Sequence, residues 1–296
     1  MSRVEEALKR LKNRSTAESA ATPTERIVKP IMPTRVSVPA VAKKKVVVES
    51  ERHHISQENL VRGGLLAPLD QAISISDEFR RIKRPLIANA EKREPGNEAH
   101  MNVIMIASAL PGAGKTFCSV NLAASMSLER ELNVLLVDAD VAKPHISREF
   151  GLSSAPGLID MLIDESIDVA DVLVRTDLND IQVLPAGRRH PQATELLASD
   201  RMSAILDEIA LRYQDRIIIF DSPPLLITSE AQALAAKMGQ IVLIVEAGRT
   251  THQILQQALD VLDKNKAINL ILNKARHWRI ESYYGGEYGY YGYGQS

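Results

Sequence analysis

A glycine-rich segment, residues 109–116, limits the possible folds of this chain more than any other part of the sequence. It reads Ala-Leu-Pro-Gly-Ala-Gly-Lys-Thr, follows a strand-sized apolar run at 102–108 and opens a stretch with helical spacing at 115–128. Glycines there let the backbone wrap around phosphate oxygens, and the amides and the helix N-terminus then face the anion. The segment therefore predicts a strand–loop–helix unit that binds the phosphates of a nucleotide.

The side chains of this loop indicate Mg-ATP as the ligand. Lys115 would reach the β- and γ-phosphates, and Thr116 would place its hydroxyl on Mg²⁺. Ala109 stands where the strict pattern has glycine. The alternative is a glycine turn with a chance Gly-Lys-Thr, which the flanking strand and helix disfavour. The residues expected to contact ATP here are Pro111, Gly112, Ala113, Gly114, Lys115, Thr116 and Phe117.

From about residue 101 onward, short apolar runs alternate with helical stretches. Most of the runs are continuously apolar, as expected for strands that are covered on both faces. This alternation predicts a doubly wound, mostly parallel α/β sheet. The expected strands are 102–108, 134–138, 181–184, 216–220, 241–246 and 269–272. The expected helices are 115–128, 158–164, 194–213, 230–238 and 252–265.

Three aspartates follow two of these apolar runs. Asp138 and Asp140 end one run, and they share a face if strand geometry persists; Asp221 ends another. Open α/β sheets bind ligands at the carboxyl ends of their strands. A lone acid after a strand is more often a helix cap, but three acids beside a phosphate loop favour a Mg²⁺ site.

Composition excludes several other classes of protein. The formal net charge is -1, so no global field attracts nucleic acid, and the run Lys43-Lys44-Lys45 is interpreted as part of a solvated linker. A single cysteine rules out a disulfide framework and suits a reducing cytoplasm. The start of the chain has no signal-peptide pattern, and no apolar run reaches the eighteen residues of a membrane span.

Changes in composition divide the chain into four expected regions. Residues 1–14 are predicted to form a short amphipathic helix, and 15–64, which are rich in proline and lack periodicity, a flexible linker. Residues 65–278 would form the phosphate-loop domain, which begins with a helix at 72–90 that Pro85 is expected to end or kink. Residues 279–296 are a Tyr/Gly-rich tail.

The chain resembles the bacterial tyrosine kinase family (BY-kinases) over residues 65–296. The resemblance rests on Pro-Gly-x-Gly-Lys at 111–115 and on hydrophobics followed by Asp-x-Asp at 134–140. It extends to Leu-Pro-Ala-Gly at 184–187 and Glu-Leu-Leu at 195–197. Two departures are Val-Ala-Lys-Pro at 141–144, where Leu-Arg-x-Pro is common, and Gln-Ala at 192–193, where Asn-Pro is frequent. The likeness is greatest to soluble autokinases of exopolysaccharide export, including those encoded with exosortase-type systems.

This resemblance implies roles and partners that the residue patterns alone do not. Asp138 would help to bind the metal and to activate the acceptor hydroxyl, and Asp140 and Asp221 would support Mg²⁺, with Lys115 completing the catalytic set. Asn273, at the end of the last strand, would contact adenine. The implied partners are a membrane-embedded polysaccharide chain-length regulator that activates the kinase and a cognate tyrosine phosphatase. The protein would be cytoplasmic and peripheral to the inner face of the membrane.

The family also carries a helix motif, Glu-x-x-Arg-x-x-Arg, which builds a ring of subunits. The helix at 72–90 offers a literal match and a shifted, conservative match. The shifted match is preferred because it is aligned on the hydrophobic Phe79 and Ile82, and the alternative is a charged, solvated face. The two sets are, in that order, Glu78, Arg81 and Arg84, and Asp77, Arg80 and Lys83.

The tail holds six of the chain's seven tyrosines and is expected to be the kinase's own substrate. A Gly-rich segment of this length has a root-mean-square reach of roughly 20–25 Å, enough to reach a neighbouring subunit. The expected phosphoacceptors are Tyr283, Tyr284, Tyr288, Tyr290, Tyr291 and Tyr293.

Two other functions are compatible with the sequence. A partitioning or positioning ATPase usually carries a second lysine in the phosphate loop, where this chain has Leu110, and often ends in an amphipathic membrane helix. A non-catalytic, nucleotide-gated adaptor of a polysaccharide polymerase would bind ATP without forming phosphotyrosine.

Overall fold

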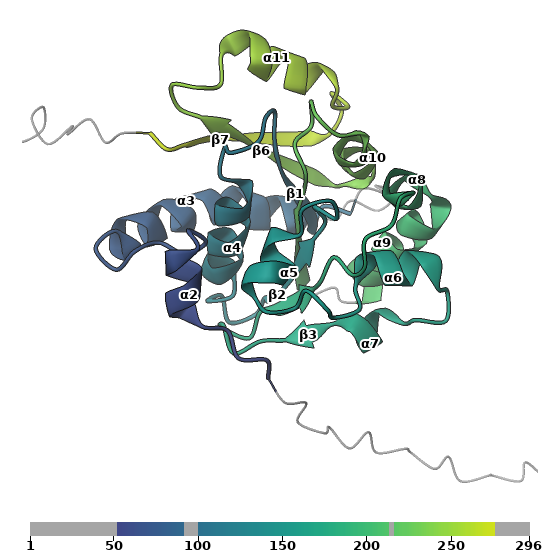
Figure 1. Ribbon diagram of the computed structural model, residues 1–296. Coiled ribbons are helices and arrows are strands. Elements are labelled where there is room, and N and C mark those ends of the chain that lie inside the picture. The colour runs from purple at the N-terminus through teal and green to yellow at the C-terminus, as the bar shows by residue number, and fades with distance from the viewer. Residues whose placement is uncertain (1–51, 92–99, 213–215, 276–296) are drawn as a thin grey trace, which may run out of the picture. The chain divides into compact units, whose positions relative to one another are not determined.

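The computed structural model describes residues 52–91, 100–212 and 216–275 (Figure 1). The expected helix at 1–14 and the tyrosine tail lie outside these residues. The described residues form a seven-stranded sheet of order β3-β4-β2-β5-β1-β6-β7, in which only the β3–β4 pairing is antiparallel. The predicted mostly parallel α/β fold is confirmed. The strands are β1 (Val103–Ser108), β2 (Asn133–Asp138), β3 (Val174–Arg175), β4 (Gln182–Leu184), β5 (Arg216–Asp221), β6 (Gln240–Glu246) and β7 (Ala267–Asn273).

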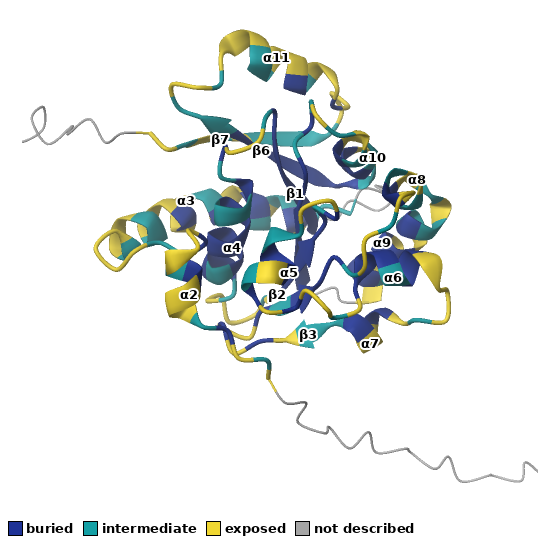
Figure 2. Ribbon diagram, viewed as in Figure 1, coloured by how far each residue is buried: buried dark blue, intermediate teal, exposed yellow. Residues whose placement is uncertain are grey.

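Helices cover both faces of this sheet, which is why its central strands are apolar throughout. Val103, Met105 and Ala107 of β1 enter one hydrophobic cluster, whereas Ile104 and Ile106 enter the cluster on the opposite face. Figure 2 shows the central strands as buried along their length. The helices are α2 (Gln57–Arg62), α3 (Ala72–Glu91), α4 (Lys115–Met126), α5 (His145–Glu149), α6 (Leu158–Ile163), α7 (Val169–Val172), α8 (Ala193–Ala198), α9 (Asp200–Arg212), α10 (Ser229–Lys237) and α11 (His252–Asp260).

Three expectations about helices differ from the structure, and the first is the helix expected at 252–265, which ends at Asp260. The stretch 194–213 forms two helices, α8 and α9, because Ser199 adopts an extended backbone and its hydroxyl accepts a hydrogen bond from the Met202 amide at 3.3 Å. Pro85 does not end α3, which continues to Glu91. The buried side chains of Phe79 and Leu86, on either side of the proline, hold that helix on the domain.

Part of the segment that was expected to be a linker, residues 52–64, is packed into the described fold. Residues 52–64 contain α2, which Ser56 caps by accepting from the Asn59 amide. Ile55 and Leu60 are buried in the domain, and His53 forms a β-bridge with Thr176. The proline-rich composition of the preceding residues concealed these two apolar anchors.

Candidate active site

The phosphate loop joins β1 to α4 in a conformation that requires glycine. Gly112 and Gly114 have φ values of 86° and 96°, in the left-handed region. A Cβ atom on Gly114 would lie 2.2 Å from the Asn273 side-chain nitrogen, so no larger residue fits there. The loop therefore presents backbone amides at the N-terminus of α4, as the sequence predicted.

The side chains of Asn273, the last residue of β7, and Lys274, which follows it, hydrogen-bond to the phosphate loop. The Asn273 Nδ2 donates to the Ala113 carbonyl at 2.8 Å, and the Lys274 Nζ donates to the Gly112 carbonyl at 2.7 Å. Glu246 pairs with Lys274 at 3.0 Å. Asn273 thus supports the loop, while its contact with adenine stays a prediction. Lys274 was not predicted from the sequence, because no local pattern brings residue 274 beside residue 112.

Lys115 begins α4 and is only 8% exposed. Burial lowers the pKa of its ammonium group, and the nearby carboxylates of Asp221 and Asp140 oppose that shift. The adjacent Thr116 side chain interacts with the Asp221 carboxylate and opposes the rise in the pKa of Asp221. The predicted lysine, threonine and aspartates therefore do come together around the first turn of α4.

Asp138 and Asp221 are directly opposite each other on the neighbouring parallel strands β2 and β5. Asp221 accepts a hydrogen bond from the Ser119 hydroxyl at 2.9 Å, and burial raises its pKa to about 6. Asp138 is fully buried, and its Oδ2 accepts from both the amide and the hydroxyl of Ser147 at 2.7 Å. Burial raises the pKa of Asp138 to about 7, against these hydrogen bonds.

The second oxygen of Asp138 is the unusual atom of the site. Its Oδ1 is buried and has no hydrogen-bond partner among the described residues. A buried carboxylate oxygen without a partner costs free energy, so such groups usually have a functional reason. An acceptor held in this way suits a proton donor or a hydrated cation.

Asp140 lies just beyond its strand, because β2 ends at Asp138 and strand geometry does not persist. Its carboxylate accepts from the Lys143 amide at 3.1 Å, and burial raises its pKa. Asp140 nevertheless faces the same cavity as Lys115 and Thr116, which has a volume of about 430 Å³. Asp138 and Asp221 are buried and do not line that cavity.

The walls of the cavity differ in chemistry. Lys143, His145 and Arg148 form a basic side, where burial and then Arg148 lower the pKa of His145. Pro111, Pro223, Pro224 and Ile227 form an apolar side, and Ile227 is 61% exposed. Apart from Pro111, the residues of these walls were not predicted from the sequence. The sequence offered one signal for them, the basic residue Lys143 in the Val-Ala-Lys-Pro segment at 141–144, which differs from the family's usual Leu-Arg-x-Pro.

The donor set fits Mg²⁺ better than a metal bound by protein alone. Within the described part of the chain, no cluster of three or more His, Cys, Asp or Glu side chains is placed to hold an ion. Mg²⁺ usually takes one or two carboxylates and completes its shell with water and phosphate oxygens. Thr116 and Asp140, which line the cavity, and the buried carboxyl groups of Asp138 and Asp221 match this preference for a few oxygen ligands.

Two predicted site residues have different surroundings from those expected. The ring of Phe117 packs against Phe79, with centroids 6.2 Å apart, so its backbone rather than its ring is available to a nucleotide. Lys83 is buried, donates to the Ser125 carbonyl and pairs with Glu129 at 2.7 Å. It is therefore not on the exposed face that a ring contact needs.

Of the preferred motif set, the structure therefore buries Lys83, and the ring contact itself stays a prediction. Lys83 follows the buried side because its ammonium group reaches two acceptors at the end of α4. The literal motif residues Glu78, Arg81 and Arg84 are all exposed. Asp77 and Arg80 are also exposed and pair with each other at 2.7 Å.

Comparison with known proteins agrees with this geometry. Residues 101–273 match the family model described as an AAA domain. The chain is 30% identical to the tyrosine-protein kinase YwqD of Bacillus subtilis over 219 residues, which cover 73% of this chain and 86% of YwqD. It is 32% identical over 212 residues to the succinoglycan biosynthesis transport protein ExoP of Rhizobium meliloti, covering 68% of this chain and 25% of ExoP.

A solved structure supports the same relationship. The kinase domain of VpsO aligns with a TM-score of 0.58 and 28% identity, covering 71% of this chain and 100% of that domain. The phosphate loop, the paired strand-end aspartates and these alignments lead to one conclusion. The chain belongs to the family of bacterial tyrosine-protein kinases, and its catalytic fold is an AAA domain.

Proposed function

We propose that this protein is an ATP- and Mg²⁺-dependent tyrosine autokinase that phosphorylates its own C-terminal tyrosine cluster, between subunits, to regulate exopolysaccharide polymerisation or export. The observation that carries the proposal is the juxtaposition of Asp138 and Asp221, in register on adjacent strands, with Lys115 and Thr116. Relatives named for tyrosine kinase activity and for succinoglycan transport support the choice of reaction and process.

The residues of the loop would position ATP for transfer of its γ-phosphoryl group. Backbone amides of residues 112–116 and the Lys115 ammonium group would bind the phosphate oxygens. Thr116, Asp140 and Asp221 would hold Mg²⁺, which when bound supplies positive charge that offsets the charge on the phosphates. Phosphoryl transfer depends mainly on such positioning and charge stabilisation, so a strong base is not required.

Asp138 would assist the acceptor tyrosine. Its unpartnered Oδ1 would accept, through a bridging water because Asp138 does not line the cavity, the proton that leaves the phenol as the new P–O bond forms and the bond to the ADP leaving group breaks. The Ser147 amide and hydroxyl hold the other oxygen and so fix the direction of Oδ1. A nearby cation would lower the pKa of Asp138 and keep its carboxylate ionised.

The described part of the chain ends at Ala275, one residue after Lys274, whose Nζ donates to the Gly112 carbonyl of the phosphate loop. The six tail tyrosines lie beyond, and transfer to them from a neighbouring subunit remains our proposal. Six phosphates at about -1.5 to -2 each would add roughly -9 to -12 to a chain of formal charge -1. We propose that this charge separates neighbouring subunits. Sedimentation before and after autophosphorylation measures this effect, and an unchanged mass contradicts it.

Partners follow from the same proposal. None of the helices that the structure describes is long and apolar enough to cross a membrane, and the matched region is only a quarter of ExoP. We propose that a separate membrane-embedded chain-length regulator activates this kinase at the inner face of the membrane, and that a cognate phosphatase resets the tail. The exposed residues Glu78, Arg81 and Arg84 are our candidates for a ring contact.

A comparison of phosphotyrosine formation by the native chain and two variants, each incubated by itself, tests the kinase proposal. The full chain should form phosphotyrosine with Mg-ATP, Lys115→Met should lose about 100-fold or more of this activity, and the exposed control Lys264→Met should retain it. Tail phosphorylation that persists in Lys115→Met alone would reject this site as the catalyst. ATP binding without any phosphotyrosine would instead favour the adaptor function.

Mixing Lys115→Met with a shortened chain tests whether transfer occurs between subunits. A chain that ends at Trp278 keeps the proposed catalytic residues but lacks the tail. When it is mixed with Lys115→Met, the longer Lys115→Met chain should acquire phosphotyrosine. If only the unmixed full-length protein modifies its tail, transfer is intramolecular.

A further inference from the structure

One short helix, α5, determines how the Asp138 carboxylate is held. Ser147 lies in the middle of α5, and its amide and hydroxyl both donate to the Asp138 Oδ2 at 2.7 Å. The same hydroxyl accepts from the Ala186 amide at 3.0 Å, so a third contact fixes it. The helix has only five residues, and a helix of this length is not stable by itself. Its position must therefore be set by the residues packed around it.

The C-terminal end of α5 is held by a residue that is distant in the sequence. Phe150 follows the last residue of α5, and its carbonyl is one of the acceptors that a helix leaves without an intrahelical donor. The His53 Nε2 donates to this carbonyl at 2.7 Å. A histidine near a helix C-terminus can satisfy a carbonyl in this way. Phe150 is buried, so the hydrogen bond connects His53 to the end of α5 that packs in the core.

His53 can act as an anchor because its own backbone is fixed. Its amide donates to the Arg175 carbonyl at 2.8 Å, and its carbonyl accepts from the Asp177 amide at 3.1 Å. These two hydrogen bonds form a parallel β-bridge with Thr176, which is fully buried. Two residues later, the Ile55 amide donates to the Asp177 carboxylate at 2.8 Å. The side chain of His53 therefore projects from a backbone that the residues after β3 hold in place.

Another contact joins the same segment to α5. Gly63, the C-cap of α2, lies so close to α5 that a Cβ atom on it would be 2.9 Å from the Glu149 Oε2. Glu149 in turn pairs at 3.0 Å with Arg148, on the basic side of the nucleotide cavity. Residues 52–64 thus contact α5 through His53 and Gly63, although neither of these residues lines that cavity.

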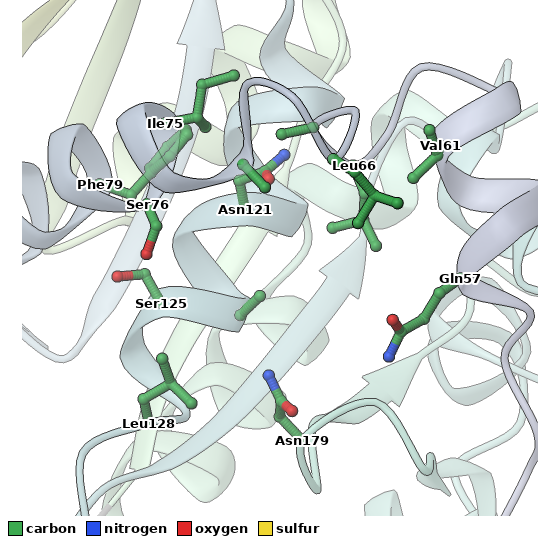
Figure 3. Close-up of a pocket in the computed structure, with 14 residues that line it drawn as sticks. Gln57, Val61, Leu66, Ile75, Ser76, Phe79, Asn121, Ser125, Leu128 and Asn179 are labelled. Atoms are coloured by element: carbon green, nitrogen blue, oxygen red, sulfur yellow. The ribbon is translucent and has the colours of Figure 1, made fainter.

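The residues that follow α2 also contact the helix of the phosphate loop. The Asn121 side chain of α4 donates to the Leu65 carbonyl at 2.8 Å. Figure 3 shows Asn121, Leu66 and Val61, which come from α4, the loop after α2 and α2 itself, around one hollow of about 270 Å³. Residues 52–66 therefore connect the helix of the phosphate loop with α5.

We propose that His53 is a positioning residue for phosphoryl transfer, because it holds α5 and thereby fixes the direction of the Asp138 carboxylate. This role rests on the proposed kinase function, in which Asp138 receives the proton of the acceptor phenol. His53 lies outside the matched AAA domain, which begins at residue 101. A shift of about 1 Å at a reacting group can cost on the order of 100-fold in rate, so a contact remote from the cavity can affect the reaction.

Initial rates of tail phosphorylation in the full-length protein test this role. At saturating Mg-ATP, His53→Ala should reduce the rate about tenfold, because α5 loses the hydrogen bond at its C-terminal end. The ATP concentration that gives half the maximal rate should change by less than about twofold, since the phosphate loop is untouched. His53→Gln, whose amide can donate to the same carbonyl, should restore most of the rate. His54→Ala is the matched control and should keep the native rate, because the neighbouring His54 is exposed and pairs with Asp177.

Other outcomes of these rate measurements would overturn the role of His53. A native rate in His53→Ala would reject the positioning role and leave the kinase function intact. An equal loss in His53→Ala and His54→Ala would assign the effect to a general loosening of the segment. A higher ATP requirement at an unchanged maximal rate would assign it to nucleotide binding. If the native chain itself forms no phosphotyrosine, the proposed kinase function fails, and the role of His53 fails with it.

A double-mutant cycle with Ser147→Ala tests the route through α5. Ser147→Ala removes the hydroxyl that donates to Asp138 and should itself reduce the rate. If His53 acts through this residue, the loss in His53→Ala/Ser147→Ala should be clearly smaller than the product of the two single losses. Losses that multiply would show that His53 acts by another route and would overturn the proposal.

Amide hydrogen exchange without nucleotide provides a measurement that does not depend on activity. His53→Ala should increase exchange at residues 147–152, whose amides bond within and just after α5 and, in the case of Ser147, to Asp138. Exchange in the central strands β1 and β5 should stay at the native level, which shows that the variant is folded. His54→Ala should leave both regions unchanged. Unchanged exchange at 147–152 in His53→Ala, or an equal increase in both variants, would contradict the positioning of α5 by His53.

Discussion

Replacing Asp138 by asparagine should make the stability of the metal-free protein less dependent on pH. Burial raises the pKa of Asp138 from 3.8 to about 7 in the folded state, whereas the unfolded chain has the ordinary value. The folded state therefore holds this proton more tightly than the unfolded state. The stabilising contribution is complete below about pH 4 and is lost as the pH rises through 7.

The pKa difference sets the size of the effect. Between pH 5.5 and 8, ionisation of Asp138 alone should reduce the free energy of unfolding of the native sequence by about 2 kcal/mol. Asp138→Asn removes this loss, because the amide does not titrate and can still accept from Ser147. The side chain is fully buried, so solvent screening does not reduce this free-energy difference.

Urea denaturation followed by circular dichroism in EDTA measures the effect at the two pH values. The native chain should lose about 2 kcal/mol more than Asp138→Asn over this interval. Asp70→Asn, at an exposed position, is the control and should follow the native chain. Parallel curves for the native chain and Asp138→Asn would refute the assignment of a raised pKa to this carboxyl group.

Three further outcomes are expected. Gly114→Ala should abolish binding of a fluorescent ATP analogue because the added Cβ would lie 2.2 Å from the Asn273 Nδ2, whereas Gly64→Ala, which also has a left-handed backbone but open space around it, should bind normally; equal binding would contradict the loop geometry. Lys83→Met should lower the free energy of unfolding by about 1–2 kcal/mol without changing the mass of the oligomer in sedimentation. Arg81→Ala should instead reduce that mass without changing the stability. A smaller mass for Lys83→Met and an unchanged mass for Arg81→Ala would favour Asp77, Arg80 and Lys83 as the ring motif. Chelation of Mg²⁺ should reduce tail phosphorylation to background, and full activity in EDTA would exclude a metal-dependent transfer.

Local sequence was sufficient to predict the central strands and the phosphate loop. Continuous apolar runs such as 216–220 can be covered on both faces only inside an α/β sheet, so periodicity alone indicated the fold class. Gly112 and Gly114 indicated a backbone that wraps around phosphate oxygens, and the structure gives both glycines left-handed φ values, which few other residues adopt. The break at Ser199 was not predicted, since one serine in a long helical pattern is compatible with either a cap or a continuous helix.

Tertiary contacts decided what periodicity could not. Lysine is usually a surface residue, yet Lys83 is buried. Its ammonium group donates to the Ser125 carbonyl in the last turn of α4 and pairs with the carboxylate of Glu129, which follows that helix. Lys274 and Asn273 are far from the phosphate loop in sequence, but β7 brings them beneath it. No local pattern encodes such pairings, because they depend on strand order.

The phosphate loop, the three aspartates and the strand–helix alternation were thus determined by sequence alone, since each follows from a local backbone or packing requirement. The partnership of the aspartates was decided by the fold: the register of β2 against β5 sets Asp138 opposite Asp221. Their buried state and raised pKa values come from the helices packed around them. The position of the aspartates at strand ends predicted that they are site residues. How far each carboxyl group is removed from water, and hence its pKa, depends on the tertiary structure.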